Sequence, residues 1–315
     1  MSLSTLPISD RLRSPDTATR RLALAGIEDE LDDVVAADLV PLLRDADVTI
    51  RKLAAGALEE LGDAAAIPGL IEAAGDADEE VALAAGGALR EFRSADAFLP
   101  LLSGLGHRAA PARAGVLVAL RHFPLAGKGA ALQAIAHLVG DAAPDVRREA
   151  VITLTHSRDA AVLPALRQAL ADADAEVRRI AVGAVAFFSA PSAVPDLVAA
   201  LKDADWQVRR EAAIALGRFP ATESAIALLE LLRDPFWQVA KEALSSLGKL
   251  KAPAARQLIP FLRHPVTDVR IAAAHALGEI GNGSPATAAA LEDAQADIDT
   301  GVQKAARAAL AKLAS

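Results

Sequence analysis

The chain has 315 residues, of which 53% are hydrophobic, and a net charge of −8, from 33 Lys and Arg against 41 Asp and Glu. It contains no cysteine, which excludes disulfides, thiolate metal sites and cysteine nucleophiles. The excess of acid argues against a general binder of polyanions, because neutralising phosphates requires surplus Lys and Arg on the contact surface. Aromatic residues make up only 3%, a composition typical of closely packed helices built from small side chains.

The start of the chain contains Asp10 and Asp16 and no apolar run, so it does not resemble a secretory signal. The longest uncharged stretch, residues 180–195, is shorter than a bilayer span and is broken by glycine and proline. We therefore expect a cytoplasmic protein without a membrane segment. Charge is unevenly distributed: residues 27–80 contain sixteen acids and three bases, whereas residues 97–140 contain four bases and no acid.

One pattern recurs along the chain: Asp, two or three residues, Val or Ile, Arg, then Ala four and Leu eight residues after the Val. In the copy DADWQVRREAAIALGRF, the apolar residues from Val208 to Phe219 fall on one narrow face at about 100° per residue, as in an amphipathic helix. The Val or its equivalent defines the anchor of each repeat, and most anchors are 31 residues apart. The anchors are Thr19, Ile50, Val81, Ala112, Val146, Val177, Val208, Val239, Val269 and Val302.

The ends of the anchored helices are also predicted. An Asp three residues before the anchor suits a helix N-cap, at Asp16, Asp47, Asp78, Asp174 and Asp205. A glycine follows the last apolar turn and is expected to end the helix, at Gly217, Gly248 and Gly278. A second apolar run, such as LPALRQAL or VPDLVAAL, precedes each anchored helix. Each repeat is therefore predicted to consist of a helix, a short turn and a second helix.

The DxxVRxxAxxALG core and its 31-residue period resemble HEAT repeats of the short type, the group that includes the bilin-lyase-like repeats of phycobilisome lyase subunits. The resemblance covers nearly the whole chain. It implies an all-α fold, a right-handed α/α superhelix, or solenoid, of about ten HEAT-like helix pairs, forming a single domain over residues 1–315. The one 34-residue gap between anchors predicts an irregularity at residues 121–145.

The resemblance also bears on the Arg that directly follows most anchors, at Arg20, Arg51, Arg113, Arg147, Arg178, Arg209 and Arg270. In HEAT-like families this Arg is implied to pair with the turn Asp of its own or a neighbouring repeat. The positions that match the HEAT pattern are those that build the helix pair. The match therefore gives almost no information about activity.

The position two residues after each anchor lies opposite the buried face and is expected to face the concave groove of the solenoid. Four successive repeats carry a cation there, at Arg148, Arg179, Arg210 and Lys241. The next position carries an acid in three of these repeats, at Glu149, Glu211 and Glu242. Two interpretations stay open: a solvated face whose charges pair with one another, and a partner-binding surface steered by the cations.

Most of the scarce aromatic residues fall in the same region. Trp206 and Trp237 occupy the same repeat position, in the turn before the second helix, and are expected to lie side by side about one repeat apart. Either each tryptophan covers the core of its own repeat, or the two form an exposed interface hot spot with Phe236.

The sequence contains few features that would indicate catalysis or metal binding. His122 and His156 share one repeat position, but helices of successive repeats lie about 8 to 10 Å apart, which strains a shared metal ion without further ligands. The HEAT-like deoxyhypusine hydroxylases use His-Glu dipeptides as iron ligands, and no His here is followed by Glu. HEAT-like DNA glycosylases need a basic concave face, which the overall acidity disfavours. We therefore predict no cofactor, no metal and no enzymatic activity.

The resulting hypothesis is a bacterial-type, non-catalytic scaffold or adaptor that binds a protein partner through the concave surface and turn edge of residues 141–250. The first alternative is an accessory subunit that helps attach or assemble a bilin-type or metal-type cofactor, as the bilin-lyase resemblance implies. The second is nucleic-acid binding through the cationic column, which predicts a steep dependence on salt. The sequence makes no prediction about oligomeric state.

Overall fold

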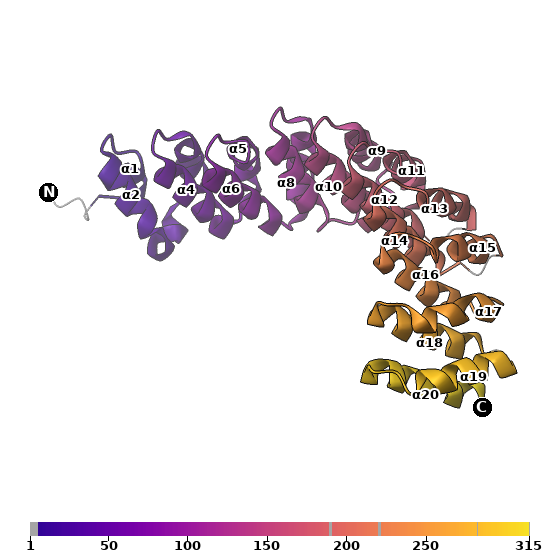
Figure 1. The fold of residues 1–315 in the computed structure, drawn as a ribbon. Coiled ribbons are helices and arrows are strands. Elements are labelled where there is room, and N and C mark those ends of the chain that lie inside the picture. The colour runs from indigo at the N-terminus through magenta and orange to yellow at the C-terminus, as the bar shows by residue number, and fades with distance from the viewer. Residues whose placement is uncertain (1–5, 189–190, 220–221, 282, 315) are drawn as a thin grey trace. The chain divides into compact units, whose positions relative to one another are not determined.

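The computed structural model describes residues 6–188, 191–219, 222–281 and 283–314. Over these residues the secondary structure is helical and contains no strand, so the predicted all-α solenoid is confirmed (Figure 1). The chain divides into two compact units, unit 1 (Met1–Ala165) and unit 2 (Leu166–Ser315), each of which is described by itself. The division falls within helix α11 (Leu163–Ala169).

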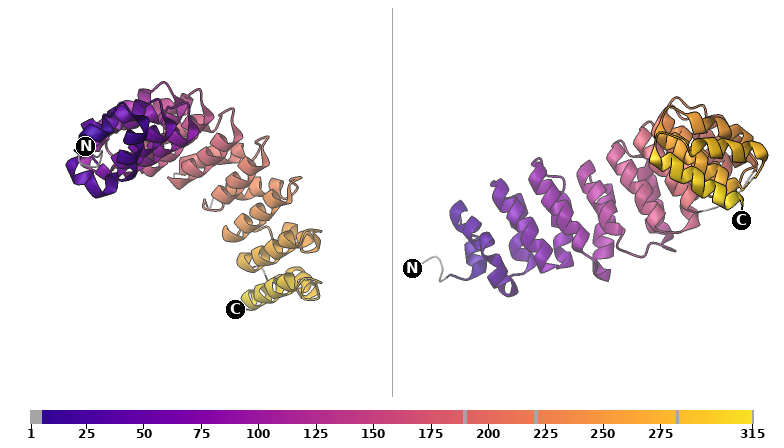
Figure 2. Two further views of the ribbon diagram at one scale, coloured as in Figure 1. Left: turned by 90° about the vertical axis from the view of Figure 1, so that its left-hand side faces the viewer. Right: turned by 60° about the horizontal axis from the view of Figure 1, so that its bottom comes forward.

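Unit 1 is a row of helix pairs in which each second helix packs on the next (Figure 2, right). The second helices are α2 (Thr17–Ala25), α4 (Val48–Leu61), α6 (Glu79–Glu91), α8 (Ala110–Leu120) and α10 (Pro144–His156). The first helices are α1 (Ile8–Leu12), α3 (Ala36–Leu39), α5 (Ile67–Ala73), α7 (Phe98–Ser103) and α9 (Gly129–His137). Short 3-10 segments extend or join them: η2 (Ile27–Asp33), η3 (Val40–Arg44), η4 (Ala64–Ala66), η5 (Ala95–Ala97), η6 (Gly104–Gly106), η7 (Leu138–Gly140) and η8 (Ala160–Val162).

Unit 2, taken by itself, has the same two-layer arrangement (Figure 2, left). Its second helices are α12 (Ala175–Phe187), α14 (Trp206–Leu216), α16 (Trp237–Lys249), α18 (Thr267–Ile280) and α20 (Thr300–Leu313). After α11, its first helices are α13 (Val194–Ala200), α15 (Thr222–Leu231), α17 (Ala255–Leu258) and α19 (Pro285–Ala294), with the 3-10 segments η9 (Pro191–Ala193) and η10 (Ile259–Arg263).

The ten anchors form the centre of the core in both units. All of them, from Thr19 to Val302, are buried, and each lies in the first turns of a second helix. Full burial of one Val or Ile side chain stabilises a fold by roughly 1.5–3 kcal/mol, a contribution that the anchor makes in the eight repeats where it is Val or Ile.

The predicted N-caps are confirmed. The carboxylates of Asp16, Asp47, Asp78, Asp174 and Asp205 each accept a hydrogen bond from a backbone N–H in the first turn of the helix that follows. These bonds satisfy donors that have no partner within the helix, which fixes where these five helices begin.

The prediction that glycine ends the second helices holds for Gly217, the C-cap of α14, but is wrong for Gly248 and Gly278. Both lie inside their helices and are buried. A Cβ at either glycine would lie 2.8 Å from the Cα of Ala276 or Ala309 on the next second helix. Glycine is therefore needed at these two positions for close packing between helices rather than for termination.

The three extra residues of the 34-residue repeat fall where the chain passes from α8 to α9. This segment, residues 121–128, contains Gly127 with φ of 74°, whose N–H donates to the Asp159 carboxylate at 3.1 Å. Among the described residues, no helix is long and apolar enough to cross a membrane.

Candidate partner-binding site

The arginine that follows the anchor links successive turns, as the resemblance implied. Nε of Arg209 donates to the Asp234 carboxylate of the next repeat at 2.7 Å, and its Nη2 donates to the other carboxylate oxygen at 3.0 Å. Its Nη1 donates to two carbonyls of its own turn, those of Asp203 and Ala204, at 2.8 and 3.1 Å. The same set of bonds is made by Arg20, Arg51, Arg113, Arg178 and Arg270.

We call each such set of bonds a rung. Hydrogen bonds from Arg178 lower the pKa of Asp203 against the opposing effect of burial, and Arg270 lowers the pKa of Asp297 in the same way. The carboxylates of Asp203 and Asp297 are therefore ionised at neutral pH, and their rungs are charge-assisted, bidentate pairs. Because these arginines are held by the scaffold, we assign them a structural role.

The cations two residues after the anchor are more exposed. In unit 2 they are Arg179 on α12, Arg210 on α14 and Lys241 on α16. Arg179 pairs with Glu176 of its own helix at 2.6 Å, and Lys241 pairs with Asp268 of α18 at 3.0 Å. Looser pairs join successive helices: Arg179 lies 4.0 Å from Glu211, and Arg210 lies 3.7 Å from Glu242.

Within unit 2, the charged column thus contains three cations (Arg179, Arg210, Lys241) and four carboxylates (Glu176, Glu211, Glu242, Asp268). Helices α12, α14 and α16 each carry both signs of charge. Such a surface has no excess of positive charge with which to neutralise phosphates. It suits a partner that itself carries both signs of charge.

Arg148 and Glu149, the remaining members of the predicted column, lie on α10 in unit 1. Arg148 pairs with Asp145 at 2.8 Å and lies 3.5 Å from Glu149. Glu149 also accepts from Arg121, a pair that is largely shielded from solvent. These two residues therefore belong to the side-chain network of α8 and α10.

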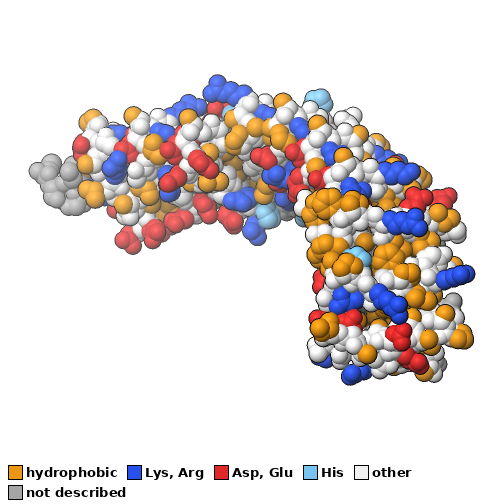
Figure 3. Space-filling view, viewed as in Figure 1, with side chains coloured by type: hydrophobic (Ala, Val, Ile, Leu, Met, Phe, Trp, Pro, Cys, Tyr) orange, Lys and Arg blue, Asp and Glu red, His pale blue; other side chains and the backbone are white. Residues whose placement is uncertain are grey.

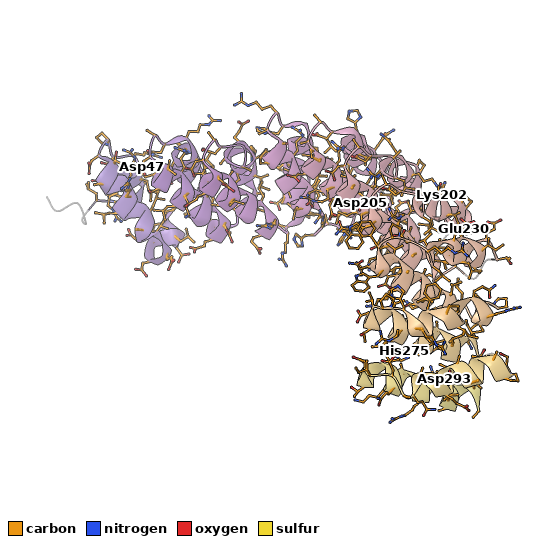
Figure 4. The ribbon with its side chains drawn as sticks, viewed as in Figure 1. Asp47, Lys202, Asp205, Glu230, His275 and Asp293 are labelled. Carbon is orange, nitrogen blue, oxygen red and sulfur yellow. The ribbon has the colours of Figure 1, made fainter. Side chains whose placement is uncertain are left out.

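A stacked aromatic pair lies at the turn edge of unit 2. The rings of Trp206 and Phe236 are nearly parallel, at 9°, with centroids 5.5 Å apart. Cζ of Arg209 lies 5.7 Å from the centre of the Phe236 ring, within the range of a cation–π contact. Phe236 is 42% exposed, whereas Trp206 and Trp237 are half-buried. In Figure 4, Asp205 marks the N-cap that directly precedes Trp206.

The sequence placed Trp206 beside Trp237, but among the described residues the ring that stacks on Trp206 is that of Phe236. Phe236 occupies the N-cap position of α16, where Asp205 stands in the preceding repeat, and α16 has no side-chain cap. Losing an N-cap costs about 1 kcal/mol. An aromatic residue in place of a capping Asp is thus the sequence signal for this stack.

Sequence reasoning also missed a shallow groove between the first helices α13 and α15. The groove has a volume of about 250 Å³, and Ile226, 58% exposed, is among the apolar residues that line it. Lys202 and Glu230 lie at this groove (Figure 4). In Figure 3, hydrophobic side chains gather over α12 to α16 with charged side chains between them.

The two histidines considered as metal ligands are exposed, and Nδ1 of His156 lies 3.0 Å from the carbonyl oxygen of Ile152 in its own helix. Among the described residues, no group of three His, Asp or Glu side chains is arranged to hold a metal ion.

Comparisons with known proteins agree with the fold. The family model for HEAT repeats matches residues 5–90, 67–155, 99–182, 163–235 and 226–311. No match was found among curated proteins. The crystal structure of an engineered protein is similar, with a TM-score of 0.53 and 22% identity, covering 98% of each chain.

A chain from the structure of Kap95p with RanGDP is also similar, with a TM-score of 0.63 and 13% identity, over 97% of this chain and 48% of that one. At these identities the likeness shows the fold alone. Because the family model covers almost the entire sequence, the chain belongs to the HEAT-repeat family.

Proposed function

We propose that this protein is a non-catalytic scaffold or adaptor that binds a protein partner through unit 2. The proposed contact surface, called the unit 2 surface below, comprises the Trp206–Phe236 stack, Trp237, the cations Arg179, Arg210 and Lys241, and their neighbours Glu211 and Glu242. The observation that carries the proposal is Phe236: it is exposed, it stacks on Trp206, and it replaces a helix cap.

The helical scaffold does not require an aromatic side chain at position 236. Repeats that have an Asp at the N-cap gain stability from it, so an exposed aromatic side chain there is costly unless it has another use. Aromatic and Arg side chains are the residues most often found at the energetic centre of protein interfaces. The cations Arg179, Arg210 and Lys241, together with the carboxylates beside them, would orient a partner and disfavour the binding of wrong ones.

The family supports a protein partner in general terms. HEAT solenoids present rows of parallel helices as extended surfaces, and the similar structure of Kap95p is one in which it binds RanGDP. The balanced charge of the column makes nucleic acid the weaker proposal. A role in bilin or metal assembly would require a pocket with suitable ligands in addition to this surface.

The test uses Phe236→Asp, because this change restores the N-cap that other repeats have. We expect the variant to be about 1 kcal/mol more stable to unfolding than the wild type. Proteins that co-purify with the wild type from the native host should be lost with Phe236→Asp, and also with the double variant Arg179→Glu and Arg210→Glu. Helix content by circular dichroism should not change in either variant.

A matched control is Leu99→Ala, which removes another exposed apolar side chain, 71% exposed, from α7 in unit 1. It should retain the partner. If all the variants retain the same protein, the unit 2 surface is not the contact. If a pigment or metal co-purifies with the wild type and with every variant, and no protein does, the cofactor-assembly alternative replaces this one.

A further inference from the structure

Two internal repeats lack the rung arginine. Ala82 and Ala240 stand where the other internal repeats carry Arg. In both cases the turn Asp of the next repeat is also missing, replaced by His107 and His264. The Nδ1 atoms of these histidines accept the backbone N–H two residues later, at 3.2 and 3.1 Å, as the turn Asp does elsewhere. The turn is therefore kept while the carboxylate that would receive an arginine is absent.

In the repeat of Ala82, the missing side chain leaves two acceptors without donors. The carbonyls of Asp76 and Ala77 are the equivalents of those that accept Nη1 in the neighbouring repeats, for example Asp45 with Arg51 at 2.9 Å. No described residue donates a hydrogen bond to either carbonyl. Even the last repeat, which has Gln303 in place of Arg, supplies a donor to its turn carbonyl, that of Asp297, at 2.7 Å.

These two residues line a groove of about 560 Å³ between α6 and α8. Part of its wall is small and apolar: Ala82, Gly86, Pro111 and Gly115 line it, and Leu83, beside them, is 65% exposed. Neither Gly86 nor Gly115 has a neighbouring side chain within 4 Å of the position that a Cβ would take. The groove is thus open to an incoming side chain of moderate width.

The charged residues that line the groove differ between its two ends. Glu79 and Asp145 lie in the first turns of α6 and α10, near the turn, whereas Arg90 lies in the last turn of α6. A cation is therefore favoured at the end near the turn. Glu79 lines the groove, is exposed, and has no ion-pair partner among the described residues. Acidic side chains are frequent along one edge of unit 1 in Figure 3, in keeping with the sixteen acids of residues 27–80. Arginine stems lie readily along apolar surface while the guanidinium reaches polar groups, which matches this combination of apolar walls and acceptors.

The second interrupted rung, at Ala240, differs both in the charge and in the open space around it. Lys241 stands where Leu83 stands in the earlier repeat, and Leu244, fully buried, stands where Gly86 stands. A cation would therefore meet a like charge there and less open volume. The two repeats share the missing arginine but not the space and charge to replace it.

We propose that the groove between α6 and α8 binds an arginine side chain presented by a partner polypeptide, whose guanidinium takes the place of the missing rung. It would donate to the carbonyls of Asp76 and Ala77, with Glu79 nearby as the counter-charge. The site lies in unit 1 and is distinct from the unit 2 surface, so either proposal can fail without the other.

The test is an NMR titration of the isotope-labelled full chain with three probes. They are a capped pentapeptide with one central arginine between alanines, the same peptide with neutral citrulline, and free L-arginine. We expect the arginine peptide to shift the backbone amides of Ala77 and Glu79, and the citrulline peptide to bind roughly tenfold more weakly or not at all. Equal binding of citrulline would overturn the proposal, and equal or tighter binding of free L-arginine would overturn its assignment to a polypeptide.

A variant that rebuilds the rung within the chain gives the sharper result. Ala82→Arg with His107→Asp should fill the groove, raise the melting temperature, and abolish the shifts. The matched control is Ala240→Arg with His264→Asp, the same change at the other interrupted rung, which should leave binding of the peptide intact. If the first variant binds the peptide as the wild type does, the groove is not the site. Phe236→Asp should leave this titration unchanged, which separates it from the unit 2 surface.

Discussion

The two interrupted rungs show that one change in sequence has different structural results in different surroundings. In unit 1, the loss of arginine at Ala82 is accompanied by Gly86, whose missing side chain leaves open space, and a groove forms between α6 and α8. In unit 2, the loss at Ala240 is accompanied by Gly248, which lies against the backbone of Ala276 and lets α16 and α18 approach closely.

The structural effect of a small residue in these helices therefore depends more on the residue that faces it than on its own identity. A helical glycine opposite another glycine makes a hollow: a Cβ at Gly115 would lie 3.7 Å from the Cα of Gly86, and a Cβ at Gly86 would meet nothing within 4 Å. A helical glycine opposite an alanine on a close neighbour makes a contact, as with Gly248 and Ala276. The rung arginines set the spacing of the turns, and these small residues set the spacing along the helices.

The largest expected effect comes from creating a third interruption. Arg209→Ala removes one partner of a pair whose side chains are only 11% and 6% exposed. The buried charge of the Asp234 carboxylate then loses the cation that compensates it. We expect the free energy of unfolding in denaturant to fall by about 3 kcal/mol. The control is Arg233→Ala, an exposed arginine one residue before Asp234, which should change stability by less than about 0.5 kcal/mol. Equal losses in the two variants would mean that the rungs do not stabilise the fold.

A smaller loss is expected at the close helix contact. Gly248→Ala places a Cβ 2.8 Å from the Cα of Ala276, so α16 and α18 must separate or bend. Overpacking of this kind costs typically about 1–3 kcal/mol, which outweighs the roughly 1 kcal/mol that alanine gains over glycine in a helix. The measurement is chemical unfolding followed by circular dichroism. A stabilised variant would show that α16 and α18 lie farther apart in solution than in this structure.

Much of the scaffold could be predicted from the sequence because it depends on local chemistry repeated many times. The anchors follow from helical periodicity, and Asp47 or Asp205 as N-caps follow from hydrogen bonding within one turn. Gly248 and Gly278 were wrongly assigned to helix ends because termination and close packing select the same residue. Only the position of the neighbouring helix distinguishes the two uses.

The candidate site was less predictable because it depends on contacts between repeats. The stack of Phe236 on Trp206 joins side chains about 30 residues apart in the sequence, at different repeat positions. The paired replacement of Ala82 and His107 is visible in the sequence. It becomes informative only once the partner of each rung arginine is known to be the turn Asp of the next repeat.

The smallest predicted effect has the opposite sign and tests the groove directly. Gly86 lies inside α6, and a Cβ there would meet nothing within 4 Å. Gly86→Ala should therefore raise the free energy of unfolding by about 0.5–1 kcal/mol, because alanine loses less backbone entropy on folding and has no neighbour to displace. Measured beside Gly248→Ala, it changes the same pair of residue types in two helices of the same kind. If both variants are destabilised, α6 and α8 lie as close together in solution as α16 and α18 do, and the groove proposed to receive an arginine is closed.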